Sequence, residues 1–191
     1  MRILIRHGTV VNADGSLAAD VLIEDEKVVQ VGPRIAADAD RTYDATGRYV
    51  IPGGVDVHTH LDMPFGDTTS ADDFESGTIA AACGGTTTIV DFAVQDPGDT
   101  LHHALETWTR KAAGKAAIDY GFHVIVTDLT ERVEREMDEL VGEGVTSFKL
   151  FLAYPGRLMV DDATIFRALL RTARNGGLVQ VHAENGGVID V

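Results

Sequence analysis

The sequence is poor in cysteine, in long apolar runs and in basic residues, and each shortage excludes something. Its single cysteine, Cys83, cannot form an intramolecular disulfide, which is typical of the reducing cytoplasm. No run approaches the roughly 18 apolar residues of a membrane span, and the first residues turn polar too early for a secretory signal. Sixteen basic against thirty acidic residues give a net charge of −14, which disfavours nucleic acid and anionic membranes as partners. We therefore expect a cytoplasmic globular protein, in which Cys83 is a small buried residue rather than a nucleophile.

Residues 1–52 have the pattern of a small β domain. Short apolar runs occupy residues 3–5, 9–11, 21–23 and 28–31. Turn-forming residues separate them, most clearly at 12–15, 25–27 and 32–33. This spacing predicts a small antiparallel sheet or sandwich.

From residue 53 to residue 191 the pattern changes to an alternation of strands and helices. Strands are expected at 55–58, 86–92, 120–127, 146–152 and 178–182, and helices at 73–83, 99–115, 131–142 and 161–174. Such repeated βα units predict a parallel sheet. A closed eight-unit barrel typically takes about 250 residues. We therefore expect either an open α/β sheet or part of a larger barrel.

His58 and His60 carry the strongest chemical signal. Residues i and i+2 of a strand point to the same face, and about 6.5–7 Å separates their backbones, so both imidazoles can reach one metal ion. Asp62 and Pro64 end the strand directly after the pair. The pair therefore lies at the carboxyl end of its strand, which is the end that carries the chemistry in parallel α/β barrels.

Three more polar residues end predicted strands. Lys149 interrupts an apolar run; it either extends its ammonium to solvent or is kept neutral by burial and modified into a metal-bridging anion. His182 is either a hydrogen-bonded core histidine or a metal ligand. Asp91 is expected to hold the strand ends together rather than to bind metal. Because His58, Lys149 and His182 share one end of successive strands, we favour a common site.

The sequence resembles the cyclic amidohydrolases, and within them the dihydropyrimidinase/D-hydantoinase branch. The resemblance is carried by residues 53–66, 70–74, 84–92, 147–156 and 181–186. It implies an N-terminal portion of a β-sandwich (1–52), followed by the first half of a metal-dependent, TIM-like (β/α)8 barrel (53–191). A further histidine ligand and a proton-shuttling aspartate come from later strands in the family. The chain is therefore expected to be the N-terminal part of a family member and to be inactive by itself.

The resemblance also implies roles for individual residues. His58 and His60 correspond to ligands of the more buried metal, and His182 to a ligand of the second. Lys149 corresponds to a carboxylated lysine that bridges two zinc ions. Tyr154 corresponds to a tyrosine that donates a hydrogen bond to the oxyanion. The residues expected to contact the ring substituent are apolar: Met63, Phe65, Phe151 and Leu158.

The implied reaction is hydrolysis of the cyclic amide bond of dihydropyrimidines or hydantoins, which opens the ring to an N-carbamoyl amino acid. The nucleophile is a hydroxide that bridges two zinc ions. The implied partners are a small cyclic ureide substrate and further copies of the chain, in a homotetramer. Neither nucleic acid nor a membrane is expected.

Two alternatives stay open on the same fold. A mononuclear deaminase also uses His-x-His and a later histidine near a glutamate, as in His182 and Glu184, but one metal needs no bridging Lys149. A non-catalytic, dihydropyrimidinase-like assembly protein would have lost metal ligands, and all four expected positions are present here. Dihydroorotase is disfavoured because Asp62 stands where that enzyme has an arginine.

Overall fold

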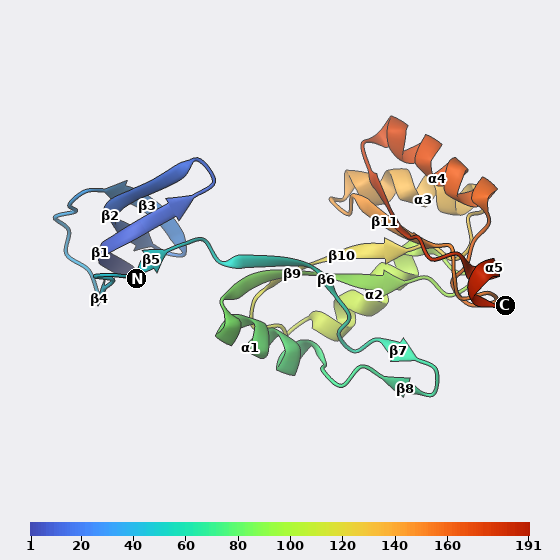
Figure 1. Cartoon of the computed structure of the whole chain (residues 1–191), viewed down its shortest axis with the longest axis horizontal. Coiled ribbons are helices and arrows are strands. Elements are labelled where there is room, and N and C mark those ends of the chain that lie inside the picture. Colours follow the sequence, from blue (N-terminus) through green and yellow to red (C-terminus); the bar gives the residue numbers. More distant parts are fainter. The chain divides into compact units, whose positions relative to one another are not determined.

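The computed structural model describes residues 1–191. It divides into two compact units, Met1–Gly53 and Gly54–Val191 (Figure 1). None of its helices is both long and apolar enough to cross a membrane.

The first unit is one five-stranded sheet in the order β3-β2-β1-β4, with β5 also paired to β1. Its β1–β2 and β2–β3 pairs are antiparallel, but β4 and β5 run parallel to β1. The expectation of an antiparallel sheet is therefore wrong for β4 and β5, which sequence patterning did not predict. A long connection after β3 returns the chain in the direction of β1. The strands are β1 (Arg2–Asn12), β2 (Gly15–Glu24), β3 (Lys27–Gly32), β4 (Arg41–Asp44) and β5 (Tyr49–Val50).

The two short strands expected at 3–5 and 9–11 are one strand, β1, with a bulge. The register with β2 shifts between Ile5 and Gly8, and His7 has a φ of 62°. The buried Asp20 carboxylate accepts hydrogen bonds from the backbone N–H of His7 (2.9 Å) and of Ile35 (3.0 Å). These backbone donors lower the pKa of Asp20. The bulge changes the direction of the strand without ending it.

The second unit contains a five-stranded sheet in the order β12-β11-β10-β9-β6, and every pair in it is parallel. This curled sheet confirms the expected first half of a TIM-like barrel. A small hairpin of β7 (Pro64–Phe65) and β8 (Thr68–Thr69), which was not predicted, follows the first strand. The sheet strands are β6 (Gly54–Thr59), β9 (Thr86–Val94), β10 (Asp119–Ile125), β11 (Ser147–Phe151) and β12 (Leu178–His182).

Four helices connect these strands, as the periodicity predicts. The side chains of Asp73, Thr100, Thr130 and Asp161 cap their N-termini. Gly85 and Gly176 end the first and last of the four in the left-handed conformation. The helices are α1 (Phe74–Gly84), α2 (Leu101–Ala112), α3 (Glu131–Gly142) and α4 (Asp162–Asn175), and a short α5 (Gly186–Ile189) was not predicted.

Strand alternation separates the packing of the sheet from its chemistry. One face, which includes Phe122 on β10 and Phe148 on β11, packs against α2, α3 and α4 in the largest apolar core. Figure 1 shows α3 and α4 side by side, where Arg167 pairs with Glu134. The residues in between, such as Lys149, point to the opposite face. The sheet thus has one face for stability and one for a site.

Cys83 is exposed, so the expectation that it is buried is wrong. Its helix, α1, buries only Phe74 and Thr78. Neighbouring alanines in the sequence suggested a buried helix, but burial depends on which face of α1 meets the sheet.

Candidate active site

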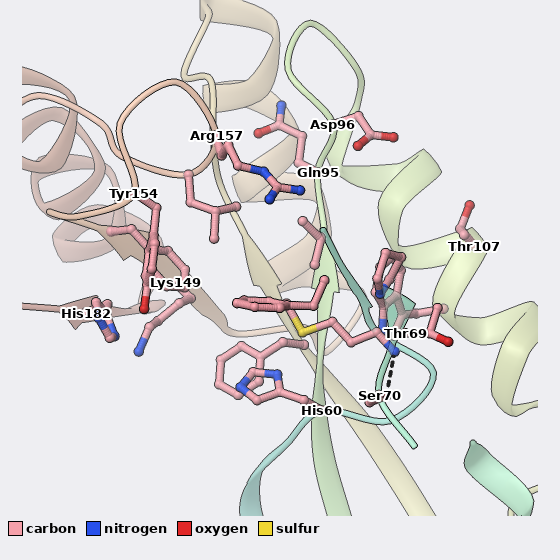
Figure 2. A pocket seen from close by; sticks show the side chains of 18 of the residues that line it. His60, Thr69, Ser70, Gln95, Asp96, Thr107, Lys149, Tyr154, Arg157 and His182 are labelled. Atoms are coloured by element: carbon pink, nitrogen blue, oxygen red, sulfur yellow. Dashed lines mark hydrogen bonds between the residues drawn. The ribbon is translucent and has the colours of Figure 1, made fainter. Parts of the chain in front are cut away.

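The carboxyl ends of the parallel strands surround a pocket of about 970 Å³. The nine site residues expected from the sequence all line it (Figure 2). The polar ones are His58, His60, Lys149, Tyr154 and His182. The apolar ones are Met63, Phe65, Phe151 and Leu158.

His58 and His60 lie together at the end of β6. Their ring centroids are 5.1 Å apart, and the Phe92 ring packs at 4.7 Å from His58 and 5.0 Å from His60. Both histidines keep contact with solvent through the pocket. Partial desolvation lowers the pKa of His60, the charges of His58 and Lys149 add to this effect, and Asp91 opposes it. The neutral imidazole that results is the form that binds metal.

Asp91 fixes the segment that carries this pair. Its fully buried carboxylate accepts hydrogen bonds from the Thr59 hydroxyl, the Leu61 N–H and the Phe92 N–H, each at 2.8 Å. Burial raises the pKa of Asp91, and the three hydrogen bonds oppose the rise. Asp91 therefore ties β6 to β9, as the sequence predicts, rather than facing the pocket as a ligand.

Lys149 brings an amine to the middle of the site. The residue is only 8% exposed, and its side chain lines the pocket rather than the outer surface. Its Nζ lies 5.8 Å from the ring centroid of Phe92 and 5.5 Å from that of Phe151, with no hydrogen bond or ion pair. Burial lowers the pKa of Lys149 and so favours the neutral amine.

His182 presents a nitrogen without a hydrogen-bond partner. Its Nε2 is buried and neither accepts nor donates a hydrogen bond. A Glu184 oxygen lies 3.2 Å away, but not in a direction that makes a hydrogen bond. The ring stacks on Phe151 at 5.1 Å. A buried polar nitrogen without a partner is costly, so this arrangement fits a ligand that the nitrogen would bind.

The three histidines do not by themselves form a cluster of three His, Cys, Asp or Glu ligands. Figure 2 shows Lys149 between His182 and His60. Lys149 therefore separates His182 from the His58–His60 pair in the pocket.

Tyr154 lies on a tight turn after β11. Its φ of 66° is in the left-handed region, at a cost of roughly 1–3 kcal/mol for a non-glycine residue. Its carbonyl accepts hydrogen bonds from the N–H groups of Arg157 (3.2 Å), Leu158 (3.1 Å) and Met159 (3.2 Å). Figure 2 shows the phenol directed toward Lys149 and His182. The strained turn therefore holds a half-exposed hydroxyl at the edge of the site.

Sequence reasoning missed one wall of the pocket, on α2. Trp108 and Lys111 line it, and Lys111 Nζ lies 4.3 Å from the Trp108 ring centroid. The same amine donates a hydrogen bond to the Asp62 carbonyl at 2.5 Å. The available signal was the spacing of Trp108 and Lys111, because residues three positions apart on a helix lie on the same side of it.

His123 on β10, described below, was also missed, although strand alternation from Ile125 places it on the pocket face.

A sequence profile described as the amidohydrolase family matches residues 49–190. The chain belongs to the amidohydrolase family. It is 56% identical to a D-hydantoinase from Streptomyces coelicolor over 100% of this chain and 42% of that protein. It is 45% identical to a dihydropyrimidinase from Rattus norvegicus over 98% of this chain and 37% of that protein. The predicted dihydropyrimidinase/D-hydantoinase resemblance is thus confirmed.

Solved structures of the same branch superpose closely on this amidohydrolase chain. The crystal structure of a dihydropyrimidinase from Brevibacillus agri NCHU1002 matches with a TM-score of 0.97 and 54% identity, over 100% of this chain and 41% of that one. An L-hydantoinase (dihydropyrimidinase) from Arthrobacter aurescens matches with a TM-score of 0.83 and 28% identity, over 98% and 42% of the two chains. The chain therefore spans about two-fifths of the length of these relatives. The family is metal-dependent.

Proposed function

We propose that this chain supplies the metal centre of a cyclic amidohydrolase that opens the ring of hydantoins or dihydropyrimidines to N-carbamoyl amino acids. One observation carries the proposal. The Lys149 amine and the His182 Nε2, neither of which makes a hydrogen bond, line one pocket together with the His58–His60 pair. Similarity to proteins named D-hydantoinase and dihydropyrimidinase supports the choice of substrate class.

In this proposal the site would hold two zinc ions, with His58 and His60 as ligands of one and His182 as a ligand of the other. The neutral amine of Lys149 would form an N–C bond with carbon dioxide and lose a proton, and the resulting carbamate would supply anionic oxygen ligands to the metal centre. A buried amine that needs no counter-ion is well placed for this reaction. When bound, the metal pair activates water as a nucleophile and polarises the substrate carbonyl.

The remaining residues orient the substrate and stabilise charge. The Tyr154 hydroxyl donates a hydrogen bond to the oxygen that becomes negative as the ring carbonyl is attacked. The apolar residues receive the ring substituent and exclude water from it. They are Met63, Phe65, Phe151 and Leu158. Three of them (Met63, Phe151 and Leu158) pack with Phe92 and Ile125 in one small cluster, which preorganises this side of the pocket.

The two alternatives fit the site less well. A single-metal deaminase would leave the amine of Lys149 buried without a partner. A non-catalytic assembly protein would have no use for a buried, unpaired His182 nitrogen. We further propose that the protein acts in the cytoplasm and forms a homotetramer. Light scattering after size-exclusion chromatography tests the oligomeric state directly.

A chimera tests the function. Residues 1–191 would replace the matching segment of the Streptomyces coelicolor D-hydantoinase, to which they are 56% identical. We expect the chimera to contain two zinc ions per subunit and to hydrolyse hydantoin or dihydrouracil. Hydrolysis of either substrate is measured by the loss of ring absorbance. A folded chimera with two zinc ions but no activity toward either ring would contradict the proposal, and one zinc ion with deaminase activity would favour the first alternative.

A further inference from the structure

His123 links strands that are not neighbours in the sheet. It lies on β10, is 7% exposed, and its Nε2 is 2.9 Å from the carbonyl oxygen of Val57 on β6. Strand β9 lies between β10 and β6 in the sheet. The imidazole therefore reaches past one strand, on the pocket face, to the residue directly before His58.

The hydrogen bonds assign the tautomer of this ring. A carbonyl oxygen only accepts, so Nε2 of His123 carries the proton. In the neutral ring Nδ1 is then an acceptor, and it faces the Ser147 hydroxyl on β11 and the Gln180 amide nitrogen on β12, the latter at 3.1 Å. Burial lowers the pKa of His123, in keeping with a neutral ring. One side chain thus connects β6, β10, β11 and β12.

This link reaches one of the two irregular points in the pairing of β6 with β9. The register with β9 passes from Asp56 opposite Ile89 to Thr59 opposite Asp91, so β6 has one extra residue there. Val57 and His58 have no register partner on β9. Bulges of this kind redirect side chains near active sites and leave ladder groups unpaired. The Val57 carbonyl is paired by His123 instead.

We propose that His123 is a positioning residue for the metal centre: through the Val57 carbonyl it sets where the His58–His60 pair lies relative to Lys149 and His182. Lys149 is two residues after Ser147 on β11, and His182 is two residues after Gln180 on β12. The bridge therefore lies one side-chain layer below the four proposed ligands and joins the strands that carry them. The inference rests on the proposed metal centre.

A first experiment needs no metal. Long-range ¹H–¹⁵N spectra of the metal-free chimera with labelled histidine report the tautomer of each ring. We expect His123 to be in the Nε2–H form, with a proton that exchanges slowly with solvent. In the double variant Ser147→Ala/Gln180→Leu, loss of this proton signal would show that the bridge has collapsed. Finding the Nδ1–H form, or a rapidly averaging ring, would overturn the inference independently of any enzymatic activity.

A second experiment measures the affinity of the same chimera for Zn²⁺ by competition with a chromophoric chelator. Loss of groups that orient metal ligands typically weakens binding about 10–100-fold. We expect His123→Leu to weaken binding by about 10-fold or more. His123→Gln, whose amide N–H still reaches toward Val57, should lose less zinc affinity than His123→Leu. It also provides a second variant for the test if the leucine variant does not fold.

Phe122→Leu is the matched control, because Phe122 is on the same strand but packs into the helix-side core. It should lower the unfolding temperature while leaving zinc affinity nearly unchanged. If His123→Leu and His123→Gln lose stability but bind zinc as the original chimera does, His123 only packs the sheet and the inference is wrong. If the chimera binds no zinc while its His123 is in the Nε2–H form, the proposed metal centre fails, and the positioning role fails with it.

Discussion

Lys149 places an amine where it meets aromatic rings and no counter-ion, with Nζ 5.8 Å from the Phe92 centroid and 5.5 Å from that of Phe151. A lysine in such a place is costly as a cation. Modification to an anion between two metal ions would remove this cost. The chemical role of the site therefore depends on this residue more directly than on any single histidine.

Replacing Lys149 in the chimera should abolish bound zinc and ring hydrolysis together. Lys149→Arg should do no better than Lys149→Ala, because a guanidinium forms no carbamate. Added bicarbonate or short carboxylic acids should partly restore the alanine variant. Metal analysis and a hydantoin assay measure both quantities, and the exposed Lys115→Ala is the control. Full activity in Lys149→Ala would refute the bridging role.

Tyr154→Phe tests the oxyanion donor. Removal of one such donor typically lowers kcat by about 10²–10³. We expect a loss of this size in the chimera with zinc content unchanged, since the turn geometry at Tyr154 depends on its backbone rather than on its hydroxyl. Loss of zinc in this variant would instead show that the tyrosine is structural.

At the scale of elements, the end of β6 is held by side chains of other strands. The ladder with β9 is irregular there. Asp91 on β9 binds the segment after the irregularity, and His123 on β10 binds the carbonyl before His58. The position of the His58–His60 pair is therefore set from both sides by buried polar groups.

Asp91→Ala should destabilise this junction. It leaves the Leu61 and Phe92 N–H groups and the Thr59 hydroxyl without their acceptor, at about 1–3 kcal/mol for each buried group left unpaired. Asp91→Asn keeps one acceptor oxygen and should lose less. Urea unfolding measures the difference, with the exposed Asp14→Ala as control. Equal stability of Asp91→Ala and the original chain would show that water replaces the carboxylate.

At the scale of the whole molecule, His123 makes stability depend on pH. Its pKa is lowered from 6.5 in the folded state, chiefly by burial. Below pH 6.5 the unfolded chain takes up a proton that the folded chain does not, so stability is full above this pH and falls as the pH is lowered. The carboxylates whose pKa is lowered, such as Asp20 and Asp161, act the same way only around and below pH 4.

We therefore expect the free energy of unfolding to decrease between pH 7.5 and pH 5.5, by up to about 1.4 kcal/mol from His123 alone. His123→Gln should reduce the dependence in this range and leave the acid range below pH 4 unchanged. The remaining dependence would come from His60, whose pKa burial also lowers. Urea titrations at several pH values measure both. A pH dependence that is the same in His123→Gln and in the original chain would assign the effect to other groups.

Local patterns in the sequence determined most of the second unit. Alternation and helical periodicity predicted β6, β9, β10, β11 and β12 and the four longer helices, because these signals lie within a single segment. The proposed ligands were also recognisable, since each ends a strand of a parallel sheet and such ends meet at one edge.

Other features were decided only by contacts between distant segments. The parallel pairing of β4 with β1, the exposure of Cys83 and the bridge from His123 to Val57 each depend on where a second segment lies. No periodicity within one element encodes such a partner. The sequence by itself therefore determined which side chains at the strand ends reach the pocket, whereas the tertiary structure decided its wall on α2 and what holds the strand ends in place. They are held by hydrogen bonds between residues that are 30 positions apart, as between Leu61 and Asp91, or 66 positions apart, as between Val57 and His123.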